Sequence, residues 1–166
     1  MINQKATDLA GIVKDLLDVA RLEAGRAMEI KAESIDIVPL ITDTLLSFSE
    51  TQERHQFNTS NLGDLPAVQA DRSRLVQVVE NLISNAIKYS PDGGIVTVFG
   101  RVVGDFVEIG VRDTGIGMTA DQQKHLFEKF YRADTSNTTI SGTGLGLTIC
   151  KLIVELHRGK IWVESE

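Results

Sequence analysis

Apolar residues near the start of the chain recur at alternating spacings of four and three residues, with charged residues between them. This heptad-like spacing predicts a helix over residues 2–26, which Gly25 is placed to end. The apolar stripe consists of Ile2, Ala6, Leu9, Val13, Leu16 and Ala20. Such a stripe is typical of a helix that pairs with another helix; the alternative is an ordinary amphipathic helix packed on its own domain.

Beyond this helix, helical and strand-like patterns alternate, with turn residues between them. The patterns predict strands at 28–34, 56–61, 95–103, 106–112 and 160–164, and helices at 36–54, 71–89 and 142–157. Ser34 or Asp36 suits the cap of the helix at 36–54, and Pro39 fits its first turn. Residues 114–141 are polar except for two apolar pairs, and a loop of this length in a compact domain is typical of a lid.

Composition narrows the class of protein. A length of 166 residues with 42% hydrophobic residues allows one ordinary domain plus an appendage. The net charge of -6 argues against a nucleic-acid partner, and no apolar stretch approaches the roughly 20 residues that cross a bilayer. Cys150 is the only cysteine, so no intrachain disulfide is possible and a reducing cytosol fits.

Three polar residues share one face of the predicted helix at 71–89. Asn81, Asn85 and Lys88 recur at helical spacing, away from the apolar face of that helix. Carboxamide oxygens are hard ligands that suit Mg²⁺, which usually takes its other ligands from water and substrate phosphates. The alternative for this stripe alone is a solvated helix face.

A glycine-rich turn, Asp113-Thr-Gly-Ile-Gly, follows the predicted strand at 106–112. A carboxylate at such a turn can accept a hydrogen bond from an exocyclic amine, and the amino group of adenine is one. Gly115 and Gly117 would let the backbone approach the base closely. Taken alone, the motif is also an ordinary turn.

A second glycine-rich turn stands where the lid meets the last helix. Gly142, Gly144 and Gly146 alternate there, and exposed N–H groups at a helix N-terminus attract phosphate. The spacing matches neither a Walker loop nor a dinucleotide-binding turn. A hinge is the alternative, and it is compatible with the phosphate site because a lid needs hinges at both ends.

Four segments together resemble a known family. DRSRLVQVVENLISNAIKYSPDGG resembles its asparagine box, DTGIGM its first glycine box, LFEKFYRAD its phenylalanine box and GTGLGL its second glycine box. The family is the catalytic and ATP-binding domain of bacterial sensor histidine kinases, within the gyrase, Hsp90, histidine kinase and MutL ATPase superfamily. The resemblance covers nearly the whole chain. It implies a Bergerat-type α/β sandwich, in which a mixed, mostly antiparallel sheet carries helices on one face.

The resemblance also implies roles for individual residues. Asn85 would bind Mg²⁺ with support from Asn81, Lys88 would touch phosphate, Tyr89 would lie against the adenine of ATP or ADP, and Asp113 would accept from its amino group. Asn81, Asn85 and Lys88 are the expected catalytic residues.

The lid and the glycine turns complete the expected site. Arg132 would reach ribose or phosphate from the lid, and Phe127 and Phe130 would anchor the lid by packing. The backbone would approach the nucleotide at Gly115, Gly117, Gly142, Thr143, Gly144, Leu145 and Gly146.

In the family, phosphate passes from ATP to a histidine on a separate helical hairpin. None of the three histidines resembles that acceptor: His55 reads as a surface residue, His125 as lid packing and His157 as a cation at a helix end. Hydrolytic relatives carry a glutamate at the position of Asn81, so the resemblance favours a phosphoryl donor. Glu80, about 100° away around the helix, reads as a surface or supporting residue.

We therefore expect two parts. Residues 1–26 resemble the second helix of the hairpin, and residues 27–166 resemble the catalytic domain without its last strand, as in a fragment trimmed at both ends or a naturally short protein. The expected partners are a hairpin domain with the acceptor histidine, a response regulator and, in the parent protein, a second copy. The parent would be cytoplasmic or anchored in the inner membrane. The rival functions are ATP hydrolysis and non-catalytic nucleotide sensing or dimerisation.

Overall fold

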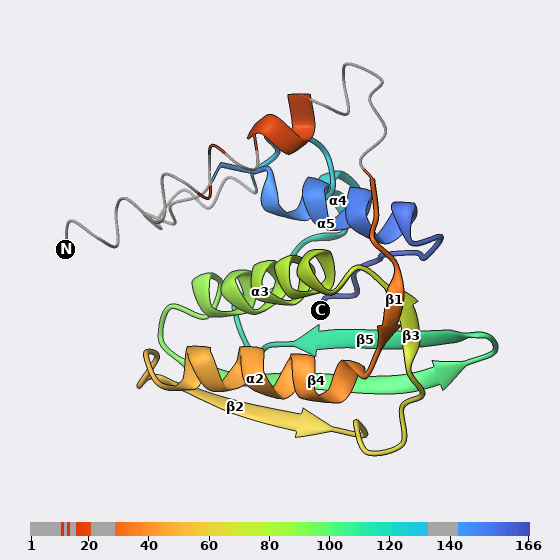
Figure 1. Ribbon diagram of the computed structural model, residues 1–166. Coiled ribbons are helices and arrows are strands. Elements are labelled where there is room, and N and C mark those ends of the chain that lie inside the picture. The colour runs from red at the N-terminus through yellow and green to blue at the C-terminus, as the bar shows by residue number, and fades with distance from the viewer. Residues whose placement is uncertain (1–10, 12, 14–15, 21–28, 133–142) are drawn as a thin grey trace.

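The computed structural model describes residues 11, 13, 16–20, 29–132 and 143–166. Its elements are β1 (Glu33–Ile35), α2 (Ile37–Ser49), β2 (His55–Ser60), β3 (Val68–Ala70), α3 (Arg72–Lys88), β4 (Gly94–Val103), β5 (Phe106–Arg112), α4 (Ala120–His125) and α5 (Gly146–Leu156) (Figure 1). One sheet has the order β2-β4-β5, with β2 parallel and β5 antiparallel to β4, and β1 pairs antiparallel with β3. The expected mixed, mostly antiparallel α/β fold is confirmed.

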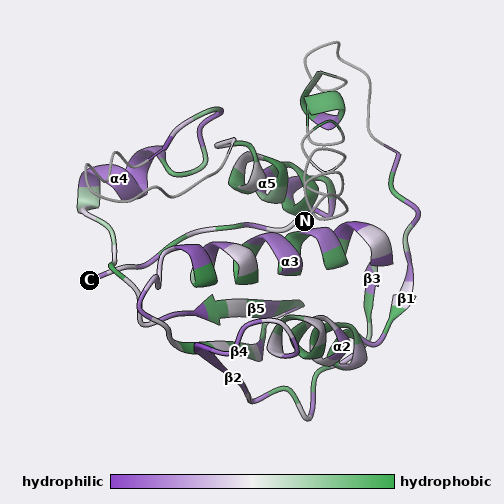
Figure 2. Cartoon of the chain, turned by 90° about the vertical axis from the view of Figure 1, so that its left-hand side faces the viewer, coloured by the Kyte–Doolittle hydropathy of each residue, from purple (hydrophilic) through white to green (hydrophobic). Residues whose placement is uncertain are grey.

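The helices form two layers over the three-stranded sheet. Helices α2 and α3 pack against the sheet, and α5 lies on the other side of α3 (Figure 2). Strand β4 alternates as a half-buried strand must, because Val96 and Val98 are fully buried while Ile95 is exposed. The core between the sheet, α2 and α3 consists of Ile35, Ile37, Leu40, Ile41, Leu45, Leu62, Ala70, Val79, Ile83 and Val98.

A second core joins α3 to α5. It consists of Val19, Val78, Leu145, Ile149, Cys150 and Ile153. Helix α3 therefore buries Val79 and Ile83 in one core and Val78 in the other, which leaves a third strip of its surface for polar residues. Cys150 is fully buried in this core and is a packing residue.

Asp71 caps the start of α3 and joins it to two other parts of the chain. Its Oδ1 accepts hydrogen bonds from the Arg74 amide (3.2 Å) and the Ser73 hydroxyl (2.8 Å), as an N-cap should. Its Oδ2 accepts from the amide of Lys31 (3.1 Å), just before β1, and its own amide donates to His157 Nε2 (2.9 Å) after α5. The segment before β1, the start of α3 and the end of α5 therefore meet at one carboxylate residue.

The expected role of His157 as a cation is wrong. Its Nδ1 lies 2.7 Å from the carbonyl oxygen of Ile153, which can only accept, so this nitrogen carries the ring proton. Its Nε2 must then be the unprotonated nitrogen, because it accepts from the Asp71 amide. The ring is thus neutral, and it bridges α5 to α3.

Several element boundaries differ from the sequence prediction. Strand β1 covers 33–35 and overlaps the strand expected at 28–34 only at residues 33 and 34, and β3 was not expected. These two short strands form because they pair with each other. Helix α4 was also not expected, although Thr119 and Gln122 form a capping box at its start. Helix α5 begins at Gly146, not at 142, because Gly144 has a φ of +72°, outside the helical region.

The strand expected at 160–164 does not form in the described chain. An alternating pattern becomes a strand only where a neighbour receives its backbone hydrogen bonds, and these residues pair in neither sheet. The C-terminal residues contact the first glycine turn instead, since the amide of Met118 donates to the Ser165 hydroxyl (2.8 Å).

Residues 16–20 are helical and pack on α3 and α5, while the rest of the helix expected at 2–26 lies mostly outside the described residues. Asp18 and Val19 are buried, and Arg74 Nη1 lies 2.8 Å from Asp18 Oδ2. Val13 and Leu16 of the heptad stripe are 52% and 54% exposed. The described part of the stripe therefore faces away from the second core. No described helix has the length and apolarity needed to span a membrane.

The cap at Asp71 predicts an acid-dependent loss of stability. Burial raises the pKa of this carboxyl, but hydrogen bonds from the Ser73 hydroxyl and from the amides of Lys31, Arg74 and Ser73 outweigh it and lower the pKa from 3.8 to about 2. Above about pH 4 the ionised carboxylate contributes its full stabilisation of the folded state. This contribution is lost as the pH falls through about 2, because the unfolded state binds the proton at a higher pH than the folded state does.

Asp71→Asn keeps a capping side chain without the charge. We expect it to lower the free energy of unfolding by on the order of 1 kcal/mol at pH 5, with the difference from wild type shrinking toward pH 2. Urea unfolding at several pH values measures this, and a pH-independent difference would contradict it.

Candidate functional site

The polar strip of α3 lies on its C-terminal half. Asn81 and Asn85 are half-buried, Lys88 is exposed in the last turn, and Tyr89 is the half-buried C-cap residue. These positions share one side of the helix because Asn85 lies four residues from both Asn81 and Tyr89 and three residues from Lys88. The structure therefore brings the expected catalytic residues onto one accessible strip.

The first glycine turn docks on the C-terminal end of this strip. The amide of Ile116 donates to the carbonyl oxygen of Tyr89 (3.0 Å). A Cβ at Gly115 would collide with that same oxygen and would lie 2.7 Å from Ser90 Oγ, so the contact requires glycine. Asp113 is exposed, and its Oδ1 accepts from the Gly115 amide (2.9 Å). Its other carboxylate oxygen has no partner in the described chain and can accept from a ligand amine.

The second glycine turn docks farther back on α3. Asn81 Nδ2 lies 3.5 Å from the carbonyl oxygen of Gly146, the first residue of α5. Gly144 takes a φ of +72°, and a Cβ there would lie 2.8 Å from the carbonyl carbon of Phe130. Thr143 Oγ1 accepts from the amide of Leu145 (3.3 Å), whose side chain is buried in the second core.

The start of α5 is suited to an anion. Helices α2, α3 and α4 begin with side-chain caps, whereas the N-cap residue of α5, Leu145, makes no side-chain cap hydrogen bond. The first N–H groups of a helix without such a cap need acceptors from outside, and the helix dipole favours negative charge there.

Both turns thus contact one helix at two points along its length. Tyr89 lies eight residues after Asn81, which at 1.5 Å per residue separates the two contacts by about 12 Å. An amine-accepting carboxylate stands at one end of this line, a helix N-terminus at the other, and Asn85 between them. The order matches the base, metal and phosphates of a nucleoside triphosphate.

The residues present fit a phosphate-bound Mg²⁺. The amide nitrogen of Asn81 is engaged by Gly146, while the carboxamide of Asn85 has no hydrogen-bond partner among the described residues. No group of three or more His, Cys, Asp or Glu in the described chain could hold a metal ion by itself. Asn85 would supply one oxygen, with the remaining ligands coming from phosphate and water.

The lid lies partly within the described residues. The Thr148 hydroxyl of α5 donates to the carbonyl of Phe127 (3.2 Å), and the Phe130 amide donates to the carbonyl of Gly144 (3.1 Å). The Phe130 ring is 62% exposed, so the expected packing role is wrong for it; its backbone makes the contact. Arg132 is exposed at the end of this segment, and Gly142 lies outside the described residues.

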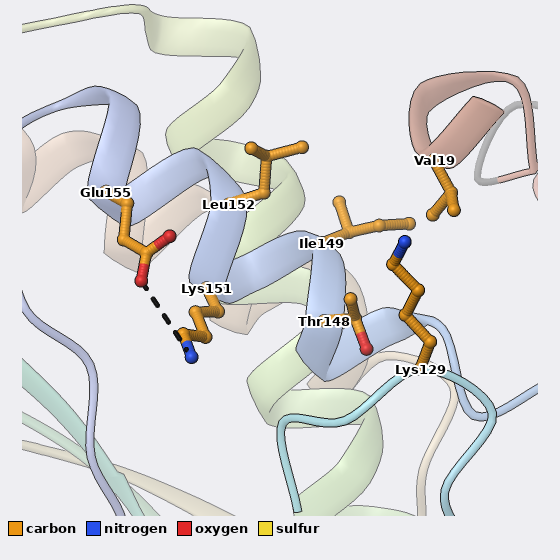
Figure 3. Close-up of a pocket in the computed structure, with 7 residues that line it drawn as sticks. All are labelled: Val19, Lys129, Thr148, Ile149, Lys151, Leu152 and Glu155. Carbon is orange, nitrogen blue, oxygen red and sulfur yellow. Dashed lines mark ion pairs between the residues drawn. The ribbon is translucent and has the colours of Figure 1, made fainter. Parts of the chain in front are cut away.

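A separate hollow of about 110 Å³ lies between α5, the lid and the N-terminal segment. It is lined by Val19, Lys129, Thr148, Ile149, Lys151, Leu152 and Glu155 (Figure 3). None of the residues expected to bind nucleotide lines it, so it is distinct from the strip on α3.

The sequence did not indicate the contact between His55 and Ser90, which lies behind the candidate site. His55, expected as a surface residue, is half-buried, and its Nε2 lies 3.0 Å from the carbonyl oxygen of Ser90. No local signal could have shown this, because the two residues are separated by 35 positions.

Comparisons with known proteins agree with this geometry. A family model described as "Histidine kinase-, DNA gyrase B-, and HSP90-like ATPase" matches residues 70–166. The chain belongs to this family. This member of the family is 37% identical over 99% of its length to the sensor histidine kinase WalK of Bacillus subtilis (strain 168), of which it spans 28%.

Solved structures place the domain in the same group. It resembles the mycobacterial sensor histidine kinase MprB, with a TM-score of 0.69 at 30% identity, covering 80% of this chain and 85% of that one. It also resembles full-length ShkA in complex with AMPPNP, with a TM-score of 0.78 at 28% identity, covering 95% of this chain and 34% of that one. Its fold is therefore that of a histidine kinase catalytic domain.

The close docking of the first turn gives a steric prediction. Gly115→Ala would push the turn away from Tyr89 and shift Asp113, so we expect ADP binding to weaken at least about tenfold, the effect of losing roughly one hydrogen bond. Gly63→Ala is the matched control, because a Cβ there meets nothing within 4 Å. Isothermal titration calorimetry measures both variants, and equal affinity for ADP would contradict the docking argument.

Proposed function

We propose that this domain binds Mg-ATP along α3 and donates the γ-phosphoryl group to a histidine on a helical hairpin domain outside the present sequence. The observation that carries the proposal is the docking of two glycine turns on one helix about 12 Å apart. Adenine would lie against Asp113 and Tyr89, and the phosphates would lie at the start of α5. ADP would occupy the same base site.

Each residue has a positioning or electrostatic task in this proposal. Asn85 would hold the metal ion, whose charge offsets that of the phosphates. Lys88 would place a cation beside the phosphates, Arg132 would add a second from the lid, and the N–H groups at Gly144 to Gly146 would hold phosphate oxygens. Catalysis would then consist mainly of holding the transferred group in line and stabilising its charge.

A hydrolytic function is less well supported. Activation of water needs a base at the phosphate end, and Asn81, which lies there, has a carboxamide that cannot accept a proton at neutral pH. Its amide nitrogen also faces Gly146, and the neighbouring Glu80 is exposed to solvent. A non-catalytic nucleotide-binding or dimerisation module is the other alternative, and only a transfer assay separates it from a kinase.

The domain division and partners form part of the same proposal. Residues 1–26 would be the end of the hairpin domain and residues 27–166 the catalytic domain. The outward-facing Val13 and Leu16 support pairing of that helix with a further helix in a homodimer. A response regulator would receive the phosphoryl group, and a reducing cytoplasm suits a chain whose single cysteine is Cys150.

Two substitutions should separate the metal end from the base end. Asn85→Ala should weaken Mg-ATP binding about a hundredfold through loss of the metal ligand, at the upper end of the range seen when groups around a metal site are removed. Asp113→Ala should weaken ADP binding even without metal, because it removes the amine acceptor. Fluorescence titrations with and without Mg²⁺ measure both, and wild-type affinity in either variant would refute the assignment of that residue.

Phosphoryl transfer is tested by adding a hairpin domain that carries an acceptor histidine. The domain and ATP should produce acid-labile phosphohistidine on the hairpin, with little release of free phosphate. Absence of phosphohistidine above background would refute the kinase proposal. Steady ATP hydrolysis abolished by Glu80→Ala would support the hydrolase instead.

A further inference from the structure

The first residue of β2 contacts Ser90, just after the end of α3, directly behind the candidate base site. His55 Nε2 lies 3.0 Å from the carbonyl oxygen of Ser90, which also accepts from the amide of Gly93 (3.0 Å). A carbonyl oxygen can only accept, so Nε2 carries the ring proton and donates it. The imidazole is therefore held in one tautomer by this bond.

The other side-chain polar atoms of His55 and Ser90 make no hydrogen bond in the described chain. His55 Nδ1 and Ser90 Oγ are both buried without a hydrogen-bond partner there. Buried unpaired polar atoms are destabilising, and native structures keep few of them. An apolar residue at position 55 would leave no unpaired ring nitrogen. We therefore attribute the presence of histidine to the hydrogen bond that its Nε2 donates.

The hydrogen bond from Nε2 fixes the backbone segment that the first glycine turn contacts. Ser90 O belongs to the residue after Tyr89, and Tyr89 O accepts the amide of Ile116. Gly115 sits against Tyr89 O and Ser90 Oγ in the same place. The backbone of residues 89–90 is thus held by the imidazole and, in turn, holds the turn that presents Asp113.

A second contact strengthens the same junction. The amide of Gly94 donates to the carbonyl of Arg54 (3.3 Å), and a Cβ at Gly93 would collide with that oxygen. On the other side, Thr114 Oγ1 accepts from the amide of Ile95 (3.1 Å). The start of β2, the loop after α3 and the base-reading turn therefore form one continuous set of contacts.

We propose that His55 is a positioning residue for the base end of the nucleotide site. It fixes the Ser90 carbonyl, and through Tyr89 and Gly115 it sets the position of Asp113. It has no contact with the phosphate end, where Asn81 meets Gly146. This inference rests on the proposed nucleotide binding, but its structural part holds without any ligand.

The test compares three substitutions at this position in the full chain. His55→Leu removes the donor at similar size, and His55→Asn replaces it with an amide too short to reach Ser90. His55→Gln keeps an N–H donor at about the reach of Nε2. Gln56→Ala is the matched control, since Gln56 is the exposed neighbour on the same strand.

The first readout is amide hydrogen exchange in the nucleotide-free protein. We expect exchange at Ile116 to speed up about tenfold in His55→Leu and His55→Asn, the effect of losing one hydrogen bond. It should stay near wild type in His55→Gln and Gln56→Ala. The amide of Ile149 in α5 reports on general stability and should be unchanged. Unchanged exchange at Ile116, or equal acceleration at Ile149, would overturn the proposal.

The second readout separates the two ends of the site. Metal-free ADP should bind about tenfold more weakly to His55→Leu and His55→Asn, whereas binding of Mg²⁺ with inorganic triphosphate should match wild type. Equal weakening of both ligands would show a merely structural role and refute the inference. If wild-type protein itself fails to bind ADP, the proposed function fails, and the exchange at Ile116 still decides the role of His55.

Discussion

The burial of α3 between the sheet and α5 is the constraint on which the rest of the structure depends. Val79 and Ile83 pack toward the sheet and Val78 packs toward α5, so two of the helix's faces are closed to solvent. Only a narrow strip remains for polar side chains, and the candidate site occupies it. Asp71 fixes the position of this helix, because its hydrogen bonds connect the segment before β1, the helix start and the end of α5.

In this arrangement α3 positions two loops along the candidate site. Two loops that are distant in sequence contact the helix at Tyr89 and at Asn81, and neither loop has to fold around the ligand by itself. The loop backbones come close because glycine leaves room at Gly115 and allows the left-handed conformation at Gly144. Helix α5 begins without a side-chain cap, whereas α2, α3 and α4 each have one, and this leaves its first N–H groups for the proposed phosphate.

The candidate site has two ends that are supported by different contacts. The proposed phosphate end is supported by the contact between α3 and α5. The proposed base end is supported by the contacts of residues 89–90, just after α3, with the start of β2 and the first glycine turn. Because these supports share no residue, a change behind one end can alter recognition of the base without altering recognition of phosphate.

The sequence by itself determined the elements whose signals are local. Apolar periodicity predicted α3 almost to its bounds, alternation predicted the two strands of the β4–β5 hairpin, and four motifs indicated the family and the polar strip. Tertiary structure decided what depends on partners far along the chain: the pairing of β1 with β3, the unpaired state of residues 160–164, and the bonds of His55 to Ser90 and His157 to Asp71. Those histidine bonds join residues 35 and 86 positions apart, and no local pattern encodes a contact that exists only once both cores have packed.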